Sequence, residues 1–247
     1  GSTFKIFTVA QALELDLVDP KTKINTKGPI RIGGHKINDY RNNGPELPVW
    51  QVITESSNLG TARIAKLIGP EKQREFLSSL GFTKPTSIEM IEASGGKPLL
   101  PKRWNELETM TISYGHGLSA TPLHLATGYA ALANGGRLVK PTLLERKEFD
   151  LGPQVISKEV AENSLAMLRG VVTEGTASLA DVNGYFVAGK TGTADKPSAQ
   201  GGYDKEKNIT NFASIFPINE PKYVLVVTLD EAQDTSGPEP KRTAGWT

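Results

Sequence analysis

The sequence contains no cysteine and only three histidines among its 247 residues. Without cysteine the fold can have neither a disulfide framework nor a thiolate metal site. His35, His116 and His124 do not have the spacing of metal ligands. The absence of cysteine and the spacing of the histidines thus give no support for a metal centre.

The chain also lacks an excess of charge and any long apolar run. Its 28 basic and 27 acidic residues give a formal net charge of +1, without the basic run that indicates nucleic-acid binding. No apolar run is long enough to span a membrane, and the first residues lack the basic-then-apolar layout of a signal peptide. The hydrophobic share of 38% nevertheless allows a substantial core, in one large domain or one domain with a lobe.

Helical periodicity dominates the first two-thirds of the chain, and strand patterns follow. The stretch Thr3–Leu17 is apolar on nearly every side, which predicts a buried helix. Prolines and glycines in Asp19–Pro48 predict turns and one short hairpin near residues 30–37. Further helices are predicted at 49–54, 58–67, 70–80, 123–133 and 157–174, strands at 139–144, 185–188, 211–217 and 223–230, and a long hairpin loop at 195–207. Helices followed by antiparallel strands indicate an α+β fold.

A short cationic stretch, Gly189–Thr193, lies at the end of the apolar run Tyr185–Ala188 and is expected to be a strand. The glycines around Lys190 and Thr191 let a ligand or another backbone approach closely. Lys190 and Thr193 offer a positive charge, a hydroxyl and backbone N–H groups, which suit a carboxylate. Taken alone, this stretch is also compatible with a strand edge that has glycines at a bulge and a solvated lysine.

Ser2 and Lys5 lie three residues apart at the start of the predicted buried helix, so they share a face. A lysine in the first turn of an apolar helix is desolvated, which lowers its pKa until the neutral amine can accept a proton. Ser2 would then lie beside a base. Taken alone, the pair has a simpler interpretation, in which Ser2 caps the helix and Lys5 is solvated.

A second hydroxyl-rich stretch, Ser56-Ser57-Asn58, opens another predicted helix. Helix capping by Ser57 or Asn58 is its simplest interpretation. In a catalytic interpretation, Ser56 relays a proton between Lys5 and a leaving-group nitrogen, while the Asn58 amide holds the substrate backbone and hydrogen-bonds Lys5. A positive Lys190 would keep Lys5 neutral by repulsion and would attract an anionic substrate.

The three stretches occur in the order Ser-x-x-Lys, Ser-x-Asn, Lys-Thr-Gly-Thr, at two helix starts and on a strand, as in serine acyl-transfer enzymes of the penicillin-recognising kind. The sequence resembles the transpeptidase domain of penicillin-binding proteins, and most closely the class B branch typified by the division-specific peptidoglycan D,D-transpeptidase. The stretch Tyr114–Gly136 is particularly specific to that branch. The resemblance covers nearly the whole chain through Gly1–Lys5, Ser56–Thr61, Tyr114–Leu118, Thr121–Leu123, Ala131–Gly136, Val172–Ala177 and Ala188–Ala194.

The resemblance implies a β-lactamase/transpeptidase-like fold, with an antiparallel sheet flanked by helices plus an all-helical lobe. It implies D-Ala-D-Ala transpeptidation, which cross-links peptidoglycan stem peptides. Ser2 would be the nucleophile, Lys5 the general base, and Ser56 the group that passes the proton to the departing D-alanine. The backbone N–H groups of Ser2 and Thr193 would form the oxyanion hole. This mechanism needs no cofactor and no metal.

The same resemblance assigns substrate binding. Thr191, Gly192 and Thr193, together with Lys190, would hold the terminal carboxylate, and Asn58 would hold the peptide amide. β-Lactam antibiotics would mimic the substrate and leave a slowly hydrolysing ester on the nucleophile.

The resemblance also implies a setting in the bacterial periplasm. Family chains carry a membrane anchor, a pedestal and the first sheet strands before the nucleophile, and a final helix after the last strand. We therefore expect residues 1–247 to be a transpeptidase domain from a longer protein anchored in the inner membrane. Other cell-wall synthesis or division proteins would bind through the absent segments. A septal role is expected, and a role in elongation is its nearest alternative.

Three related activities remain open. A serine β-lactamase needs a base for its deacylating water, which in one large class is a Glu-x-x-Leu-Asn loop, and Glu89, Glu92, Glu106 and Glu108 do not begin that pattern. A D,D-carboxypeptidase transfers the acyl group to water and is not separable from a transpeptidase by sequence. A non-catalytic β-lactam sensor domain shares all three motifs, although the stretch Tyr114–Gly136 favours the biosynthetic enzyme.

Overall fold

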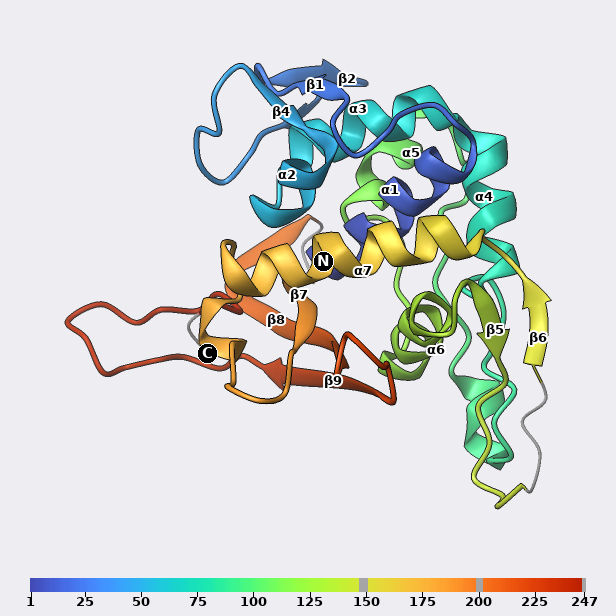
Figure 1. The fold of residues 1–247 in the computed structure, drawn as a ribbon. Coiled ribbons are helices and arrows are strands. Elements are labelled where there is room, and N and C mark those ends of the chain that lie inside the picture. The colour runs from blue at the N-terminus through green and yellow to red at the C-terminus, as the bar shows by residue number, and fades with distance from the viewer. Residues whose placement is uncertain (147–150, 199–201, 246–247) are drawn as a thin grey trace.

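The computed structural model describes residues 1–146, 151–198 and 202–245, and Figure 1 shows the arrangement of their helices and strands. The helices are η1 (Ser2–Phe4), α1 (Lys5–Glu14), α2 (Val49–Thr54), α3 (Asn58–Ile68), α4 (Pro70–Ser79), η2 (Ile91–Gly95), α5 (Glu106–Ser113), α6 (Pro122–Ala133), α7 (Lys158–Thr173) and η3 (Ser178–Ala180). The strands are β1 (Lys23–Asn25), β2 (Ile30–Ile32), β3 (His35–Ile37), β4 (Glu46–Pro48), β5 (Arg137–Val139), β6 (Leu151–Gln154), β7 (Ala188–Pro197), β8 (Tyr203–Phe216) and β9 (Tyr223–Asp230).

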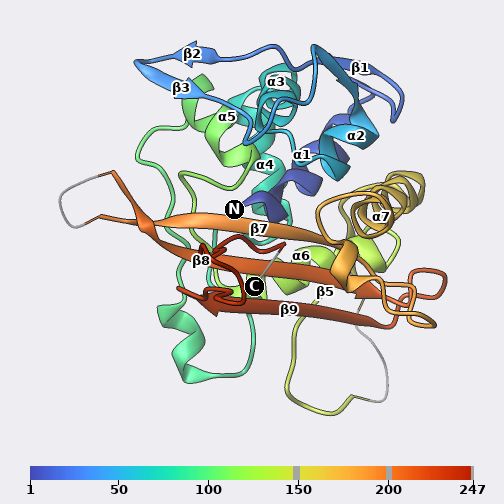
Figure 2. The same cartoon turned by 90° about the vertical axis from the view of Figure 1, so that its left-hand side faces the viewer.

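The main sheet has the order β7-β8-β9 and is antiparallel throughout. Helices α6 and α7 pack against this sheet, while α3, α4 and α5 form a helical lobe on the other side of α1. Figure 2 shows β7 as the strand of the sheet that faces the helical lobe. The expected α+β fold, with an antiparallel sheet flanked by helices plus a helical lobe, is confirmed.

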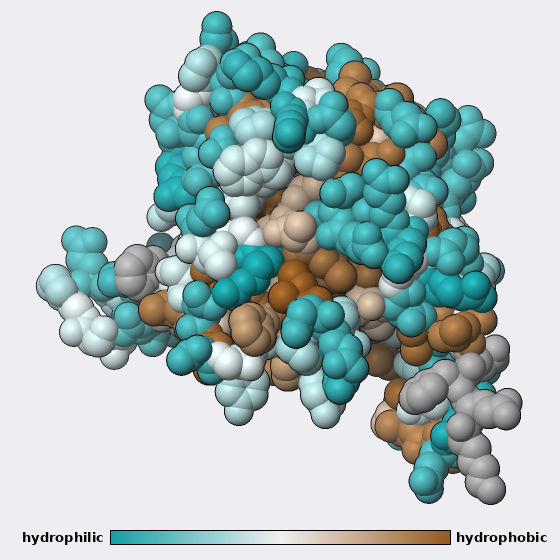
Figure 3. Space-filling model, in the orientation of Figure 1, coloured by the Kyte–Doolittle hydropathy of each residue, from teal (hydrophilic) through white to brown (hydrophobic). Residues whose placement is uncertain are grey.

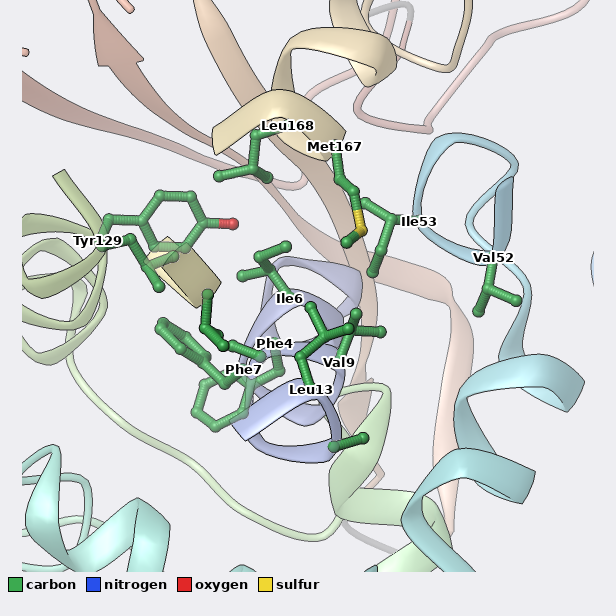
Figure 4. Close-up of a cluster of buried hydrophobic side chains, with 14 of the residues drawn as sticks. Phe4, Ile6, Phe7, Val9, Leu13, Val52, Ile53, Tyr129, Met167 and Leu168 are labelled. Atoms are coloured by element: carbon green, nitrogen blue, oxygen red, sulfur yellow. The ribbon is translucent and has the colours of Figure 1, made fainter. Parts of the chain in front are cut away.

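Helix α1 lies between the sheet and the helical lobe, and it is buried from Lys5 to Leu13. Its aromatic side chains belong to a cluster in which Phe7 contacts Phe82 and Tyr129, with ring centroids 5.1 Å and 5.6 Å apart (Figure 4). Such aromatic pairs contribute about 0.5–1.5 kcal/mol each beyond the area that they bury. Because α1 is held on all sides, its first turn has a fixed position against β7.

Most predicted helices agree with the structure, but three details differ. The predicted helix Thr3–Leu17 begins as the 3₁₀ turn η1, and α1 ends at Glu14, because the chain turns at Asp16 with φ +52°. Helix α5 was not predicted, although Asn105 and Glu108 form a capping box that marks its start. The hairpin near residues 30–37 is confirmed by the β2–β3 pair, whereas the β1–β4 pair was not predicted.

Two strand predictions and part of one loop prediction are wrong. The strand expected at 139–144 ends at Val139, with Pro141 two residues beyond it. The apolar run Tyr185–Ala188 is not a strand, because Phe186 has φ +48° and β7 begins only at Ala188. In the stretch expected to be a loop at 195–207, residues 195–197 and 203–204 are paired in β7 and β8, and residues 199–201 lie outside the described residues. Its polar residues are compatible with strands because ion pairs such as Lys196 with Glu231 form along the sheet surface.

The surface facing the viewer in Figure 3 is largely hydrophilic at its rim, and apolar side chains gather near its centre next to α7. None of the described helices combines the length and apolarity needed to cross a bilayer.

Candidate active site

The three predicted motifs converge on Ser56. Lys5 Nζ lies 2.5 Å from the carbonyl oxygen of Ser56 and 3.1 Å from its Oγ. Lys190 Nζ lies 2.9 Å from the same Oγ and also donates to the carbonyl oxygen of Thr191 at 3.1 Å. The Ser56 hydroxyl is therefore placed between two amines that come from positions 51 and 134 residues away in the chain.

Both lysines are completely buried. Burial lowers the pKa of Lys5 well below its ordinary value, the charge of Lys190 lowers it further, and the Asp39 carboxylate partly opposes the shift. Burial lowers the pKa of Lys190 to about 7. Two ammonium groups on one hydroxyl repel each other, so the arrangement favours a neutral Lys5 beside a Lys190 that loses its charge near neutral pH.

Ser2 lies at the first position of η1, one turn before Lys5, and it is half-buried. The Phe4 amide closes this turn by donating to the carbonyl oxygen of Gly1 at 3.1 Å. The Tyr129 hydroxyl of α6 donates to the carbonyl oxygen of Thr3 at 3.0 Å. The turn that carries the predicted nucleophile is thus held by its own backbone and by a neighbouring helix.

Strand β7 lies directly against η1 at Gly192. A Cβ on Gly192 would lie 3.1 Å from the Thr3 nitrogen and 3.2 Å from the Ser2 nitrogen, and a Cβ on Gly1 would lie 3.3 Å from the Thr193 nitrogen. The absence of side chains therefore brings the amides of Ser2 and Thr193 to the same junction. Gly192 is thus a spacer that permits close approach, and the oxyanion hole formed by these two amides stays a prediction.

Gly115 supports the same turn from the loop before α6. It adopts φ +85°, and its carbonyl oxygen accepts a hydrogen bond from the Gly1 nitrogen at 2.9 Å. A Cβ on Gly115 would lie 2.0 Å from the Gly1 carbonyl oxygen, so any side chain would displace the turn. The sequence did not predict that Gly115 supports this turn, because the only signal at Gly115 was the family resemblance of the stretch around it.

The predicted carboxylate-binding threonines have partners within the protein. The Thr191 hydroxyl lies 2.7 Å from the Thr176 hydroxyl and is buried. The Thr193 hydroxyl accepts a hydrogen bond from the Ala244 amide at 3.0 Å. Of these two, Thr193 is the more exposed and lies closer to the nucleophile turn, so Thr193 is better placed than Thr191 to meet a ligand. Thr176 was not among the predicted site residues.

Asn58 lies beside the site but does not make the expected hydrogen bond with Lys5. Within the described ranges its amide nitrogen donates instead to the carbonyl oxygen of Asn38, at 3.0 Å. Ser57, not Asn58, caps α3, since its hydroxyl accepts from the Gly60 amide at 2.9 Å. The capping interpretation is thus right for Ser57, while Ser56 is left to contact the lysines.

A cleft of about 440 Å³ adjoins the nucleophile turn. Thr3, Phe4, His116 and Tyr203 are among its lining residues, and the rings of His116 and Tyr203 have centroids 5.7 Å apart. Burial lowers the pKa of His116 to about 4, so this ring is neutral at physiological pH. Among the described residues, no group of three or more acidic or histidine side chains is placed to bind a metal ion.

The family model of the penicillin-binding protein transpeptidase domain matches residues 1–245. The chain belongs to this family. The match includes all three motifs that meet at Ser56, so the geometry above is that of a transpeptidase domain.

Named relatives agree with this assignment. The probable peptidoglycan D,D-transpeptidase FtsI of Caulobacter vibrioides is 32% identical over 257 residues, which cover 100% of this chain and 43% of that protein. The peptidoglycan D,D-transpeptidase FtsI of Escherichia coli is 31% identical over 235 residues, which cover 94% of this chain and 39% of that protein. The chain thus spans less than half the length of these relatives.

Solved structures show the same fold. The transpeptidase domain of penicillin-binding protein 3 from Burkholderia pseudomallei has a TM-score of 0.87 at 36% identity, covering 94% of this chain and 70% of that one. Penicillin-binding protein 3 from Mycobacterium tuberculosis, solved in complex with aztreonam, has a TM-score of 0.88 at 29% identity, covering 99% of this chain and 59% of that one.

Proposed function

We propose that this protein is a peptidoglycan D,D-transpeptidase that works through an acyl-enzyme on Ser2. The observation that carries the proposal is the position of the Ser56 hydroxyl, 3.1 Å from Lys5 Nζ and 2.9 Å from Lys190 Nζ, in a domain of the penicillin-binding family. A serine nucleophile needs a nearby base and a fixed route for its proton. The two buried amines and the hydroxyl between them supply both.

In the acylation step, Ser2 Oγ attacks the carbonyl carbon of the penultimate D-alanine while neutral Lys5 accepts the hydroxyl proton. The oxygen that becomes negative is stabilised by the amides of Ser2 and Thr193, and such a donor contributes roughly 10²–10³ in rate. Ser56 then passes a proton to the nitrogen of the terminal D-alanine, the C–N bond breaks, and an ester on Ser2 remains. The protein groups in this step come from η1, the first residue of α1, the turn before α3, and β7.

In the second step, the amine of a neighbouring stem peptide attacks the ester carbonyl, and the proton returns to Ser2 as the cross-link forms. The positive form of Lys190 attracts the terminal carboxylate of the donor, and the Thr193 hydroxyl binds it. A β-lactam would acylate Ser2 in the same way. Its leaving nitrogen stays tethered to the acyl group, so it blocks the attacking amine and the ester persists.

We further propose that the site operates in the periplasm in septal cell-wall synthesis. The resemblance to the division-specific branch supports this setting. In the longer relatives the transpeptidase stretch is less than half of the chain, so an inner-membrane anchor and contacts with other cell-wall synthesis proteins would reside elsewhere. Elongation is the alternative setting, and selective depletion distinguishes the two, because loss of a septal enzyme produces filaments.

The first test is intact mass spectrometry of the purified protein incubated with benzylpenicillin. We expect a persistent one-to-one adduct that is absent in Ser2→Ala and unchanged in Ser119→Ala, an exposed serine that lines the neighbouring cleft. An adduct that is shed within minutes would indicate a β-lactamase. No adduct on a protein that circular dichroism shows to be folded would contradict the role of Ser2.

The second test separates transfer to an amine from transfer to water. A stem pentapeptide ending in D-Ala-D-Ala is incubated with and without an amine acceptor peptide, and the products are weighed by mass. We expect a cross-linked dimer and released D-alanine. Release of D-alanine without a dimer at any acceptor concentration would indicate a carboxypeptidase. An adduct with penicillin but no turnover of the peptide would indicate a sensor domain.

A further inference from the structure

Asp39 holds the turn that carries Ser56, although it belongs to none of the three motifs. Its Oδ1 accepts a hydrogen bond from the Leu59 amide at 2.8 Å, and its Oδ2 accepts one from the Ser57 hydroxyl at 2.7 Å. The Asn43 side chain also donates to Oδ2, at 3.0 Å, and orients the carboxylate. One side chain therefore links the β3–β4 loop to the first turn of α3.

The turn that Asp39 holds has a strained backbone. Ser56 adopts φ +57°, which is uncommon for a residue other than glycine. Such a conformation persists only where the surroundings determine it, and it is found preferentially at functional sites. The neighbouring Asn58 amide donates to the carbonyl oxygen of Asn38, so residues 38 and 39 together fix both sides of the turn.

This conformation is what directs Ser56 at the lysines. Both its carbonyl oxygen and its hydroxyl face Lys5 Nζ, at 2.5 Å and 3.1 Å, while the hydroxyl also faces Lys190. A turn released from Asp39 would relax toward φ below zero and would rotate these two oxygens away from the amines. Proton transfer depends on hydrogen-bond distances of about 2.6–3.2 Å, so the relay would be broken.

We propose that Asp39 is a positioning residue for acyl transfer, which acts by fixing the Ser56–Asn58 turn against Lys5 and Lys190. This inference rests on the proposed function. The role is geometric and not electrostatic, because the negative charge of Asp39 raises the pKa of Lys5 and so opposes formation of the neutral base. Burial lowers the pKa of Arg63 on α3, and the Asp39 carboxylate partly opposes that shift as well.

A geometric role and an electrostatic role of Asp39 predict opposite effects of Asp39→Asn on the acylation rate. Removing the charge lowers the pKa of Lys5, so an electrostatic role would leave acylation unchanged or faster at acid pH. A geometric role predicts slower acylation at every pH, because the amide cannot accept from the Ser57 hydroxyl, the Asn43 amide and the Leu59 amide together. The acid limb of the pH profile should still move to lower pH, because Lys5 loses an anionic neighbour.

The experiment measures acylation of the purified protein by a chromogenic cephalosporin in stopped flow, which separates the acylation rate constant from the preceding binding constant. Asp39→Ala should lower the rate constant about 100-fold, the usual effect of a misplaced catalytic group, with the binding constant unchanged. Asp39→Asn should lose less, since it keeps one acceptor. Asp19→Ala is the matched control, because Asp19 accepts backbone hydrogen bonds from Lys21 and Thr22 at 2.7 Å and 2.9 Å in another loop.

The inference is overturned if either Asp39 variant is folded and acylates at the wild-type rate, or if its rate falls no more than that of Asp19→Ala. It is also overturned if only the binding constant changes. Should Asp39→Ala fail to fold, Asp39→Asn decides the question on its own. If wild-type protein forms no adduct, the proposed function fails instead, so the two failures are distinguishable.

Discussion

Replacing Gly192 by alanine would separate the two amides that the structure brings together at the nucleophile turn. The new Cβ would lie 3.1 Å from the Thr3 nitrogen and 3.2 Å from the Ser2 nitrogen, and ordinary contacts of a Cβ begin at 3.4 Å. A third neighbour, Thr3 Cγ2 at 3.1 Å, belongs to a side chain, but the two nitrogens are backbone atoms, so a change of rotamer does not relieve their contacts. The turn is also held by Tyr129, so β7 and η1 must move apart by a few tenths of an ångström.

The expected loss follows from the narrow range of oxyanion-hole geometry. Useful donors lie 2.7–3.1 Å from the oxyanion, so a shift of about 0.3 Å moves a donor at 2.9 Å out of this range. Removing one donor costs roughly 10²–10³ in rate. We therefore expect acylation of Gly192→Ala to be slower by about 100-fold. Overpacking should also lower the free energy of unfolding by about 1–3 kcal/mol.

The assay is stopped-flow acylation by a chromogenic cephalosporin, with thermal unfolding followed on the same samples. Gly96→Ala is the matched control, because its Cβ would lie 3.3 Å from Ala93 O and from Thr121 Cγ2, a similarly tight contact away from η1. We expect the control to lose stability without losing rate. A Gly192→Ala protein that acylates as fast as Gly96→Ala would refute the assignment of the oxyanion hole.

Two further predictions concern charge and packing. Because burial lowers the pKa of Lys190 to about 7, its positive charge is present below pH 7 and is lost above it. The second-order acylation constant of the free enzyme should therefore fall above about pH 7, and a constant that still rises at pH 9 would contradict this. Phe7 is 1% exposed, so Phe7→Ala should lower the free energy of unfolding by about 3–5 kcal/mol in urea titration; a loss below 1 kcal/mol would mean that the cluster around Phe7 is not packed as described.

Much of the helical part of this fold follows from local signals. The apolar run after Lys5 predicts a buried helix, because a helix that is apolar on nearly every side has no face suited to water. The same reasoning predicts a desolvated lysine, and burial indeed lowers the pKa of Lys5. Capping signals such as Ser57 and the proline at the start of α6 set helix boundaries because they act on neighbouring backbone groups.

Strands were harder to place, because their limits depend on pairing between distant residues. Phe186 belongs to an apolar run of strand-like composition, yet its backbone has φ +48° and the sheet begins at Ala188. Conversely, Lys196 and Asp204 occur in a polar stretch and are nevertheless paired across the β7–β8 hairpin. Composition alone does not reveal which residues find a partner.

Four properties could be predicted without coordinates: the three motifs, their order, the buried helix that follows the turn of the predicted nucleophile, and the family to which the chain belongs. These properties depend on residues that are close together in the chain, so their spacing and hydrophobic pattern are enough to predict them. Three contacts became visible only in the folded structure. Ser56 lies between Lys5 and Lys190, and Asn58 contacts Asn38 and not Lys5. Asp39 holds the turn before α3. Such contacts join positions from 18 to 134 residues apart, so they exist only once distant elements have packed together.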